Sequence, residues 1–420
     1  MRWVLWSGGG LVAVLVLYLL VTIGLARREL ETVRQQLGEL EWTSLSYESS
    51  VDGTGPLHAL ALWPRDGRPL KLLVMMHGYT ETAADYFSAG CHWARQGRLV
   101  LLPDMRGRHS ELRYPMELLA RRRPLPLPGW RTVLSLVARP LAEGDYRSGG
   151  KPDSGGVEVL DIRDAVALAR RQFGDRLARG VDIVGYSGGG TSALLAAIRF
   201  PDIFDRVIAF FPIVDFASQE AHLRRLGRAP HAQLLSWLGG GPRQAAGRYA
   251  ARRLLDGLGN LRWTGTLVLG DSEDESCPVE ALERLARRAG ELPSIRVLVS
   301  RPADSPRWHH DTADEDAALH EAAWPRPVEG ERAWGGDWMV LGYLVMPQVE
   351  VWLGDGQQGL ARCKVSRTDD NLTVCLEPVD LPAGTRARVR VRIAGRWQEW
   401  GDLPIDGTCT PFGPSHEEQR

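Results

Sequence analysis

One stretch constrains the fold of this 420-residue chain more than any other: a short apolar run, then a glycine-rich turn, then a helical pattern. Residues 181–184 read Val-Asp-Ile-Val, and Gly185-Tyr-Ser187-Gly-Gly189 follows before a helical pattern at 191–198. The two outer glycines stand two residues either side of Ser187, where side chains would collide with the adjoining strand or helix. A Gly-x-Ser-x-Gly turn between a strand and a helix is typical of a nucleophile elbow, which holds the serine in a strained backbone conformation. A glycine-rich connection without chemistry is the alternative.

Length and composition indicate one large globular domain with an additional module. Hydrophobic residues make up 44% of the chain, charged residues 25%, and the net charge is -1. This near-neutral charge gives no global reason to expect nucleic-acid binding, and neither a zinc-finger spacing nor a dinucleotide fingerprint occurs. The five cysteines are too few for a disulfide scaffold and contain no Cys-x-x-Cys pair. We therefore expect no metal, no cofactor and no nucleic-acid partner.

The N-terminal segment carries no charge from residue 4 to residue 25 and has arginines on both flanks. About 20 such residues match the thickness of a bilayer core. A cleaved signal peptide is the alternative, but the run is long for one and no Ala-x-Ala site follows. We predict a single-pass transmembrane anchor at 1–28, a juxtamembrane helix or stalk at 29–55, and a folded domain outside the cytoplasm. Positive charge on both flanks leaves the membrane face undecided.

From residue 56 the chain alternates short apolar runs with amphipathic stretches. Residues 57–63 and 70–76 flank a turn rich in Pro and Gly, which predicts a hairpin that leads into a buried strand. Because parallel strands need helical crossovers, the alternation predicts an α/β domain over 56–325, with a mostly parallel sheet covered on both faces. The other strands are predicted at 98–103, 181–184, 206–212, 266–270 and 295–299, with helices at 157–173 and 279–288.

A serine hydroxyl is a weak nucleophile at neutral pH, so Ser187 would need a base, an acid that orients the base, and hydrogen-bond donors for the oxyanion. His77-Gly78-Tyr79 follows directly on a predicted strand, where a turn can aim a backbone N–H at the reacting carbonyl. We predict that the N–H groups of Tyr79 and Gly188 are the two oxyanion donors. The alternative is that His77 and Gly78 merely end the strand.

The candidate acid is Asp274, which lies just after the strand predicted at 266–270. Four acidic residues crowd this loop, and Asp271, immediately after Gly270, is the alternative assignment. A solvated acidic loop without a catalytic role is the competing interpretation.

The candidate base is one of two adjacent histidines, His309 and His310, which follow the strand predicted at 295–299. A Thr-x-x-Glu capping box opens a predicted helix at 312–323 directly after them. We assign the base to His310 because it stands nearer this helix, with His309 as the alternative.

Taken together, these motifs resemble the α/β-hydrolase superfamily, and most of all its branch of proteins similar to prolyl oligopeptidases, acetyl-xylan esterases and dienelactone hydrolases. The resemblance covers about residues 55 to 325. It rests on His77-Gly78-Tyr79, Asp104-Met-Arg106-Gly107, Gly185-Tyr-Ser187-Gly-Gly189, Asp274 with Pro278, and the segment from Asp153 through Asp161 and Asp164 that leads into the helix before the elbow.

The resemblance implies an α/β-hydrolase fold with a triad of Ser187, His310 and Asp274, and a serine hydrolase that cleaves carboxylic esters. Peptidases of this branch usually carry a large propeller before the catalytic domain, and residues 26–55 are too few for one, which favours an esterase. A peptidase for short peptides is the first alternative, and a catalytically silent binding or scaffold protein on the same fold is the second.

Two features depart from the family pattern. The family's histidine usually has a glycine beside it, whereas Trp308 precedes the pair here. An insert at 111–148, rich in Leu, Pro and Arg, follows the strand predicted at 98–103. Basic residues interleaved with Leu and Trp suit a lid or a membrane-facing patch, and a solvated surface loop is the alternative.

After residue 325 the helical pattern gives way to short runs typical of strands, which predict a small β-rich C-terminal module over 326–420. A hairpin that turns at 368–370 would place Cys363 directly opposite Cys375. Outside the cytoplasm this pair would form a cross-strand disulfide, and two reduced core cysteines are the alternative. The predicted strands are 337–346, 349–353, 361–365, 372–376 and 387–393.

Overall fold

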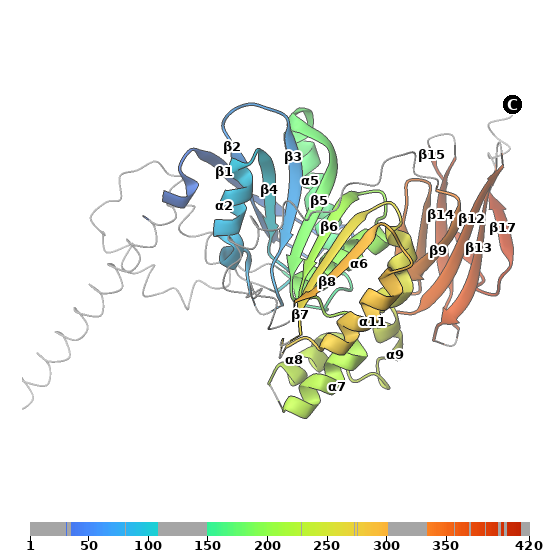
Figure 1. Cartoon of the computed structure of the whole chain (residues 1–420). Helices are drawn as coiled ribbons and strands as arrows, with labels where there is room; N and C mark the ends of the chain where they lie inside the picture. Colours follow the sequence, from blue (N-terminus) through green and yellow to red (C-terminus); the bar gives the residue numbers. More distant parts are fainter. Residues whose placement is uncertain are drawn as a thin grey trace, which may run out of the picture.

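The computed structural model contains an α/β domain followed by a C-terminal domain built on a second sheet (Figure 1). The residues it describes are 31, 35–79, 81–107, 149–227, 229–272, 274, 276–300, 334–356, 358–368, 371–382, 384–393, 396–398 and 401–412. The predicted anchor at 1–28, the insert at 111–148, the predicted helix at 312–323 and both candidate base histidines lie outside these residues. Within the described ranges, no helix is long and apolar enough to cross a membrane.

The first sheet has eight strands in the order β1-β2-β4-β3-β5-β6-β7-β8. Strands β3 to β8 are parallel, and β2 runs antiparallel to its neighbours β1 and β4. Nearly every residue of the inner strands is buried, as the apolar runs in the sequence predict. The strands are β1 (Leu40–Tyr47), β2 (Leu57–Pro64), β3 (Leu70–Met76), β4 (Arg98–Pro103), β5 (Leu177–Tyr186), β6 (Phe204–Phe210), β7 (Gly265–Asp271) and β8 (Ile295–Ser300).

The predicted hairpin at 57–76 is wrong in its pairing, although both of its strands exist. Strand β4 lies between β2 and β3, antiparallel to the first and parallel to the second. A short turn fixes only how close two strand ends lie. Both strands are buried along almost their whole length, so each needs partners on both sides within the sheet, and β4 supplies one to each.

The predicted stalk at 29–55 is also wrong over part of its length. Residues Leu40–Tyr47 form β1, the first strand of the sheet, which pairs with β2 from Leu40 opposite Pro64 to Tyr47 opposite Leu57. The strand lies at the edge and is only half-buried, with Leu40 and Leu45 turned inward. Such an edge strand shows little of the apolar alternation that would reveal it in a sequence.

Helices cover both faces of this sheet. Helix α2 packs on one face, around Trp93, whereas α5, α6 and α11 share the core on the other face. Helices α7 and α8 lie beyond the carboxyl ends of the strands, at the bottom of Figure 1. The helices are α2 (Phe87–Arg95), α5 (Glu158–Phe173), α6 (Gly188–Arg199), α7 (Phe216–Leu226), α8 (Ala229–Leu238), α9 (Ala246–Ala250), α10 (Leu254–Gly257) and α11 (Val279–Ala289), with short 3-10 turns η1 (Ala83–Tyr86), η3 (Gly174–Arg176) and η4 (Leu258–Leu261).

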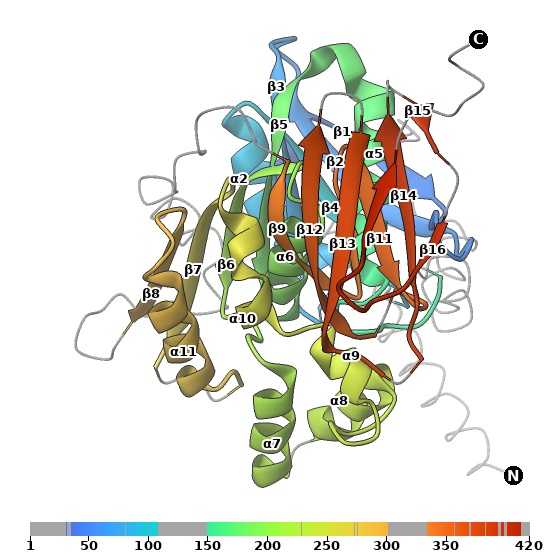
Figure 2. The same cartoon turned by 90° about the vertical axis from the view of Figure 1, so that its right-hand side faces the viewer.

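The predicted β-rich C-terminal module is present as a nine-stranded antiparallel sheet with a core of its own. Figure 2 shows its strands β12, β13 and β14 in front of the α/β domain. Leu341, Tyr343, Trp352 and Leu360 join the core of the α/β domain, so the two domains pack together through buried side chains. The strands are β9 (Gly336–Leu341), β10 (Tyr343–Val345), β11 (Val349–Leu353), β12 (Leu360–Thr368), β13 (Asn371–Asp380), β14 (Ala387–Ile393), β15 (Arg396–Trp397), β16 (Gly401–Leu403) and β17 (Cys409–Phe412).

The predicted disulfide between Cys363 and Cys375 is wrong by one residue of register. Thr368 pairs with Asn371 across a turn one residue tighter than expected, and Cys363 therefore stands opposite Leu376. A shift of one residue sends a side chain to the other face of a sheet. Cys363 accordingly lies as a free thiol in the core of the C-terminal domain.

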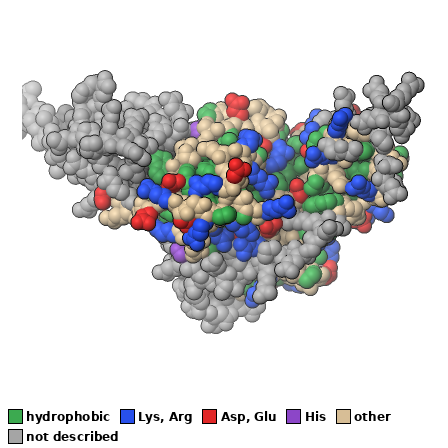
Figure 3. Space-filling view, turned by 90° about the horizontal axis from the view of Figure 1, so that it is seen from above, with side chains coloured by type: hydrophobic (Ala, Val, Ile, Leu, Met, Phe, Trp, Pro, Cys, Tyr) green, Lys and Arg blue, Asp and Glu red, His purple; other side chains and the backbone are tan. Residues whose placement is uncertain are grey.

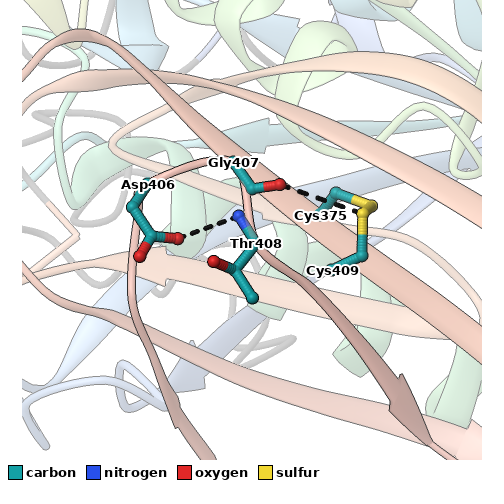
Figure 4. The surroundings of a disulfide bond; sticks show 5 residues. All are labelled: Cys375, Asp406, Gly407, Thr408 and Cys409. Atoms are coloured by element: carbon teal, nitrogen blue, oxygen red, sulfur yellow. Dashed lines mark hydrogen bonds between the residues drawn. A yellow bond between two sulfur atoms is a disulfide. The ribbon is translucent and has the colours of Figure 1, made fainter.

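A disulfide does form in this domain, between Cys375 and Cys409. The two residues stand opposite each other on β13 and β17, and Figure 4 shows the bond beside the turn that leads into β17. In that turn the Thr408 N–H donates to the Asp406 carboxylate at 2.8 Å. The bond therefore ties the last described strand to the rest of the domain.

Candidate active site

The strand, turn and helix predicted around Ser187 are present as β5, a one-residue turn and α6. Ser187 has φ 51° and ψ -120°, a backbone conformation that residues with side chains rarely adopt. Its N–H donates to the Phe210 carbonyl at 2.8 Å, and its own carbonyl accepts from Thr191 at 3.1 Å. The neighbouring strand and the first turn of α6 thus hold the serine in a strained position at the carboxyl edge of the sheet.

Close backbone approach explains the glycines around Ser187. A Cβ on Gly185 would lie 2.2 Å from the Gly189 carbonyl oxygen, and one on Gly189 would lie 2.4 Å from the Met76 oxygen. A Cβ on Gly188 would lie 2.2 Å from the ring of Tyr79. The elbow therefore packs directly on the end of β3 and on the loop that follows it.

That loop carries the predicted oxyanion donor Tyr79. A Cβ on Gly78 would lie 3.5 Å from the Cβ of Ser187, so the loop passes beside the serine. The Tyr79 N–H donates no hydrogen bond to any group that the structure describes. Gly188 is the first residue of α6, and an N–H at that position has no partner within its helix. The two predicted donors therefore flank Ser187 with N–H groups that protein acceptors in the described region do not use.

A glutamate that the sequence analysis missed holds this loop. One oxygen of Glu81 accepts the Gly78 N–H at 2.8 Å and also the hydroxyl of Tyr86. The Glu81 N–H in turn donates to the Gly78 carbonyl at 3.1 Å. The only signal in the sequence is an acidic residue three positions after a glycine, which is too common to single out.

His77 stabilises the same region and is already fully occupied. Its Nε2 accepts the Met105 N–H at 3.0 Å, so the ring proton is on Nδ1, which donates to the Gly78 carbonyl at 2.8 Å. The side chain is 1% exposed. His77 thus joins the loops after β3 and β4, and it has no free nitrogen with which to act as the base.

The ring of Tyr79 is wedged between the elbow and α8. Its ring centre lies 5.5 Å from that of Trp237, edge to face. Burial raises the pKa of the Tyr79 hydroxyl well above its usual value, and the charge of Glu158 adds to this. The hydroxyl is therefore neutral over the range in which enzymes work, and Tyr79 contributes its backbone N–H and its bulk to the site.

Behind Tyr79, two carboxylates organise the start of α5. Glu158 accepts the N–H groups of Asp153 and Gly155, both at 3.0 Å. Asp153 accepts the N–H groups of Gly156 at 3.0 Å and of Val157. Burial, reinforced by the charge of Asp153, raises the pKa of Glu158 to about 7. The charge of Glu158, behind the loop that carries Tyr79, therefore depends on pH.

Asp274 lies in the loop after β7, two strands from β5 at the same edge of the sheet. Its Oδ1 accepts the N–H groups of Ser276 at 2.7 Å and of Cys277 at 3.1 Å. Asp271, the alternative acid, is the last residue of β7, and its carbonyl accepts the Asp274 N–H at 3.3 Å. These bonds fix Asp274 through one oxygen and leave Oδ2 without a hydrogen bond to any described group.

The acid loop is also attached to α7. The side-chain amide of Gln219 donates to the Ser276 carbonyl at 2.7 Å. The thiol of Cys277 donates to the Phe211 carbonyl at 3.3 Å, and burial raises its pKa well above the usual value. Cys277 is therefore a protonated, structural thiol.

Two further segments that carry the family resemblance meet in a buried ion pair. The guanidinium of Arg106 binds both oxygens of Asp161 and also reaches Asp52 at 2.7 Å. Burial raises the pKa of Asp161 to about 6, although the Arg106 guanidinium opposes this rise. The pair ties the loop after β4 to α5 and has a structural role. The described residues contain no group of three His, Cys, Asp or Glu side chains that could hold a metal ion.

One known protein family matches part of the chain. The esterase family model matches residues 168–322, a range that includes Ser187, Asp274 and both candidate histidines. No curated protein matches the sequence significantly.

Similar solved structures come from several organisms. An esterase of Pyrococcus furiosus is 15% identical, with 70% of this chain and 96% of that one covered and a TM-score of 0.45. An acylaminoacyl peptidase of Pyrococcus horikoshii is 14% identical, with 72% and 44% covered and a TM-score of 0.48. Est1E of Butyrivibrio proteoclasticus, with ferulic acid bound, is 16% identical, with 66% and 100% covered and a TM-score of 0.41. The strand order and the elbow agree with an α/β-hydrolase fold, and residues 168–322 are similar to an esterase family.

Proposed function

We propose that the protein is a serine hydrolase that cleaves carboxylic esters through an acyl-enzyme on Ser187. The strained position of Ser187 at the N-terminus of α6, beside the Tyr79 loop, carries this proposal. A glycine-bounded serine with unused N–H groups on two sides is costly to build, and it suits attack on a carbonyl carbon.

In the proposed reaction, Ser187 Oγ attacks the ester carbonyl as its proton passes to His310. The N–H groups of Tyr79 and Gly188 stabilise the oxyanion, helped by the positive end of the α6 dipole. His310 then protonates the leaving alcohol, and water, activated by the same histidine, releases the acid and restores Ser187.

The role proposed for Asp274 follows from its hydrogen bonds. Oδ1 is occupied by two loop amides, so Oδ2 is available to accept an N–H from the histidine and fix its tautomer. For the base, His310→Ala should lower kcat at least about a thousandfold, whereas His309→Ala should keep activity within about tenfold. The reverse result would move the base to His309.

The same site suits a short-peptide peptidase, which remains the alternative function. Initial rates on short and long nitrophenyl esters and on an aminoacyl anilide separate the two, with Ser187→Ala as the control. Ester turnover that exceeds anilide turnover and disappears in Ser187→Ala supports the esterase. Preferential anilide cleavage supports the peptidase. No turnover that depends on Ser187 supports the silent scaffold.

We further propose that residues 1–28 anchor the protein in a membrane, with the folded domains outside the cytoplasm. The uncharged run in the sequence supports the anchor. The disulfide between Cys375 and Cys409 supports an oxidising location. Alkaline carbonate extraction of membranes tests the anchor, and release of the protein into the supernatant would contradict it. Thiol labelling of the native protein tests the location outside the cytoplasm, and free thiols at Cys375 and Cys409 would contradict it.

A further inference from the structure

Positive charge is in excess at the amino edge of the sheet of the α/β domain, although Asp66, Asp175 and Glu291 also stand there. The amino edge is formed by the turns that lead into β3, β5 and β8 and by the ends of α5 and α11. Figure 3 looks onto this edge and shows Lys and Arg side chains gathered over its middle. Six exposed arginines stand here, and none of them forms an ion pair with a carboxylate that the structure describes: Arg65, Arg170, Arg171, Arg179, Arg287 and Arg296. We call these six residues the basic edge.

The opposite, carboxyl edge carries acidic residues together with the exposed Arg224 and Arg225 of α7, and Arg284, which pairs with Asp215. Glu81 and Asp85 follow β3, Asp215 follows β6, and Asp271 and Asp274 lie at and after the end of β7. The chain as a whole has a net charge of -1, so the basic edge is a local feature that the composition conceals. With strands about 4.8 Å apart, an eight-stranded sheet spreads this positive charge over roughly 35 Å.

The chain enters the domain at the basic edge. Strand β1 begins at Leu40, opposite Pro64 at the end of β2, which is the amino edge of the sheet. Just before it, the Gln36 carbonyl accepts a hydrogen bond from Arg95 at the end of α2. Eight residues separate Arg28 from Leu37 in the sequence, and fully extended they reach at most about 28 Å. The amino edge is therefore the edge tethered near the predicted anchor.

We propose that the basic edge rests on a membrane surface rich in anionic lipids, with the Ser187 site turned toward the aqueous side. This inference rests on the proposed anchor. Arginines on the tethered edge are attracted to anionic headgroups within about a Debye length of the surface. Substrate then reaches Ser187 from solution.

The test places a fluorophore on each edge of the full chain in vesicles that contain a headgroup spin label as quencher. Ala178→Cys labels the exposed start of β5 beside the basic edge, and Arg225→Cys labels the exposed face of α7 beyond the carboxyl edge. Vesicles of phosphatidylcholine are compared with vesicles that also contain phosphatidylglycerol, at low and high salt. Unsubstituted protein gives the labelling background of the native thiols.

We expect quenching at residue 178 to exceed quenching at residue 225 severalfold, to rise with phosphatidylglycerol, and to fall with salt. In a variant with Arg65, Arg170, Arg171 and Arg179 all changed to Glu, the preference for phosphatidylglycerol should disappear. Changing the same four residues to Gln removes their charge without reversing its sign. This variant should show a weaker preference for phosphatidylglycerol than the wild type does. All four are exposed, so an unchanged thermal midpoint shows that the fold is intact.

Equal quenching at residue 178 on both kinds of vesicle, or stronger quenching at residue 225, overturns the inference. Retention on heparin together with equal quenching would assign the basic edge to an anionic polymer instead. A full chain that fails to associate with vesicles overturns the anchor and the inference together. Ser187→Ala should behave as the wild type does, so a failure of the proposed catalysis is distinguishable from a failure here.

Discussion

Arg199, the last residue of the elbow helix α6, donates from Nε to the carbonyl oxygen of Leu341 on β9 at 3.0 Å. Its other nitrogens reach the carbonyls of Gly155 at 2.6 Å and of Ala251 at 2.8 Å. The side chain is fully buried, and its guanidinium lies 4.5 Å over the ring of Tyr343. One arginine thus joins the helix that follows Ser187 to the C-terminal sheet and to the loop before α5.

Replacing this arginine should therefore destabilise both domains together. Arg199→Leu leaves several buried carbonyls without donors, at a cost of about 3 kcal/mol or more in the free energy of unfolding. Urea denaturation followed by circular dichroism measures the cost. Arg224→Leu is the matched control, because Arg224 is 67% exposed and has one long ion pair, so its loss should cost less than about 1 kcal/mol. Equal midpoints for the two variants would contradict this role of Arg199.

Adding one methyl group at Gly188 should lower activity far more than stability. The new Cβ would lie 2.2 Å from the ring of Tyr79, so the oxyanion loop has to move away from Ser187. We expect Gly188→Ala to reduce kcat by about a hundredfold or more, the usual result of losing an oxyanion donor. Gly241→Ala, where a Cβ meets nothing within 4 Å, is the control and should keep full activity. Wild-type rates from Gly188→Ala would show that Tyr79 is no part of the site.

Glu158 should make the stability of the α/β domain depend on pH. Burial and the charge of Asp153 raise its pKa to about 7 from an ordinary 4.5. Between these values the folded protein holds a proton that the unfolded chain has released, so the free energy of unfolding falls as pH rises from about 4.5 to about 7. Each unit of pKa difference corresponds to about 1.4 kcal/mol, so the free energy of unfolding should fall by up to about 3 kcal/mol over this pH range.

Urea midpoints measured across this pH range, in wild type and in Glu158→Gln, isolate that contribution. The fall should be smaller in Glu158→Gln, and Glu280→Gln, an exposed change on α11, should match the wild type. An identical pH dependence in Glu158→Gln would mean that Glu158 is ionised in the folded protein throughout the range.

Reduction should weaken the C-terminal domain through one disulfide alone. Cys375 and Cys409 are 34 residues apart, and closing a loop of that length stabilises a fold by about 3 to 4 kcal/mol on the chain-entropy model. Dithiothreitol should lower the thermal midpoint of the wild type, and Cys375→Ser should remove that response. Cys363→Ala should retain it. Loss of the response in Cys363→Ala would restore the pairing predicted from the sequence.

The sequence predicted the parts of the fold that depend on local chemistry. The Gly-x-Ser-x-Gly motif located the elbow because only glycine fits where Gly185 approaches Gly189. A position that requires glycine can be recognised directly in the amino-acid sequence. The apolar runs located the inner strands because residues buried on both faces leave no polar alternation. Asp274 was identifiable as a candidate by its place after a strand, with Asp271 in the same loop as the alternative.

The parts of the fold and of the candidate site that the sequence did not predict depend on contacts between residues that are distant in the chain. The insertion of β4 between β2 and β3, and the pairing of β1 with β2, are choices among apolar strands that look alike in a sequence. The cysteine pairing changed because Thr368 pairs with Asn371, a single step of register. Glu81 and Arg199 support the elbow from 106 and 12 residues away in the chain, and no short motif marks either of them.

Covalent trapping of the nucleophile tests the central claim most directly. The full chain is treated with a fluorophosphonate, digested, and the modified residue is located by mass spectrometry, with Ser187→Ala and the exposed Ser366→Ala as matched variants. We predict one phosphonylated residue, Ser187, with labelling lost in Ser187→Ala, retained in Ser366→Ala and slowed in His310→Ala. Labelling of another residue, or ester turnover that persists in Ser187→Ala, would contradict the central claim.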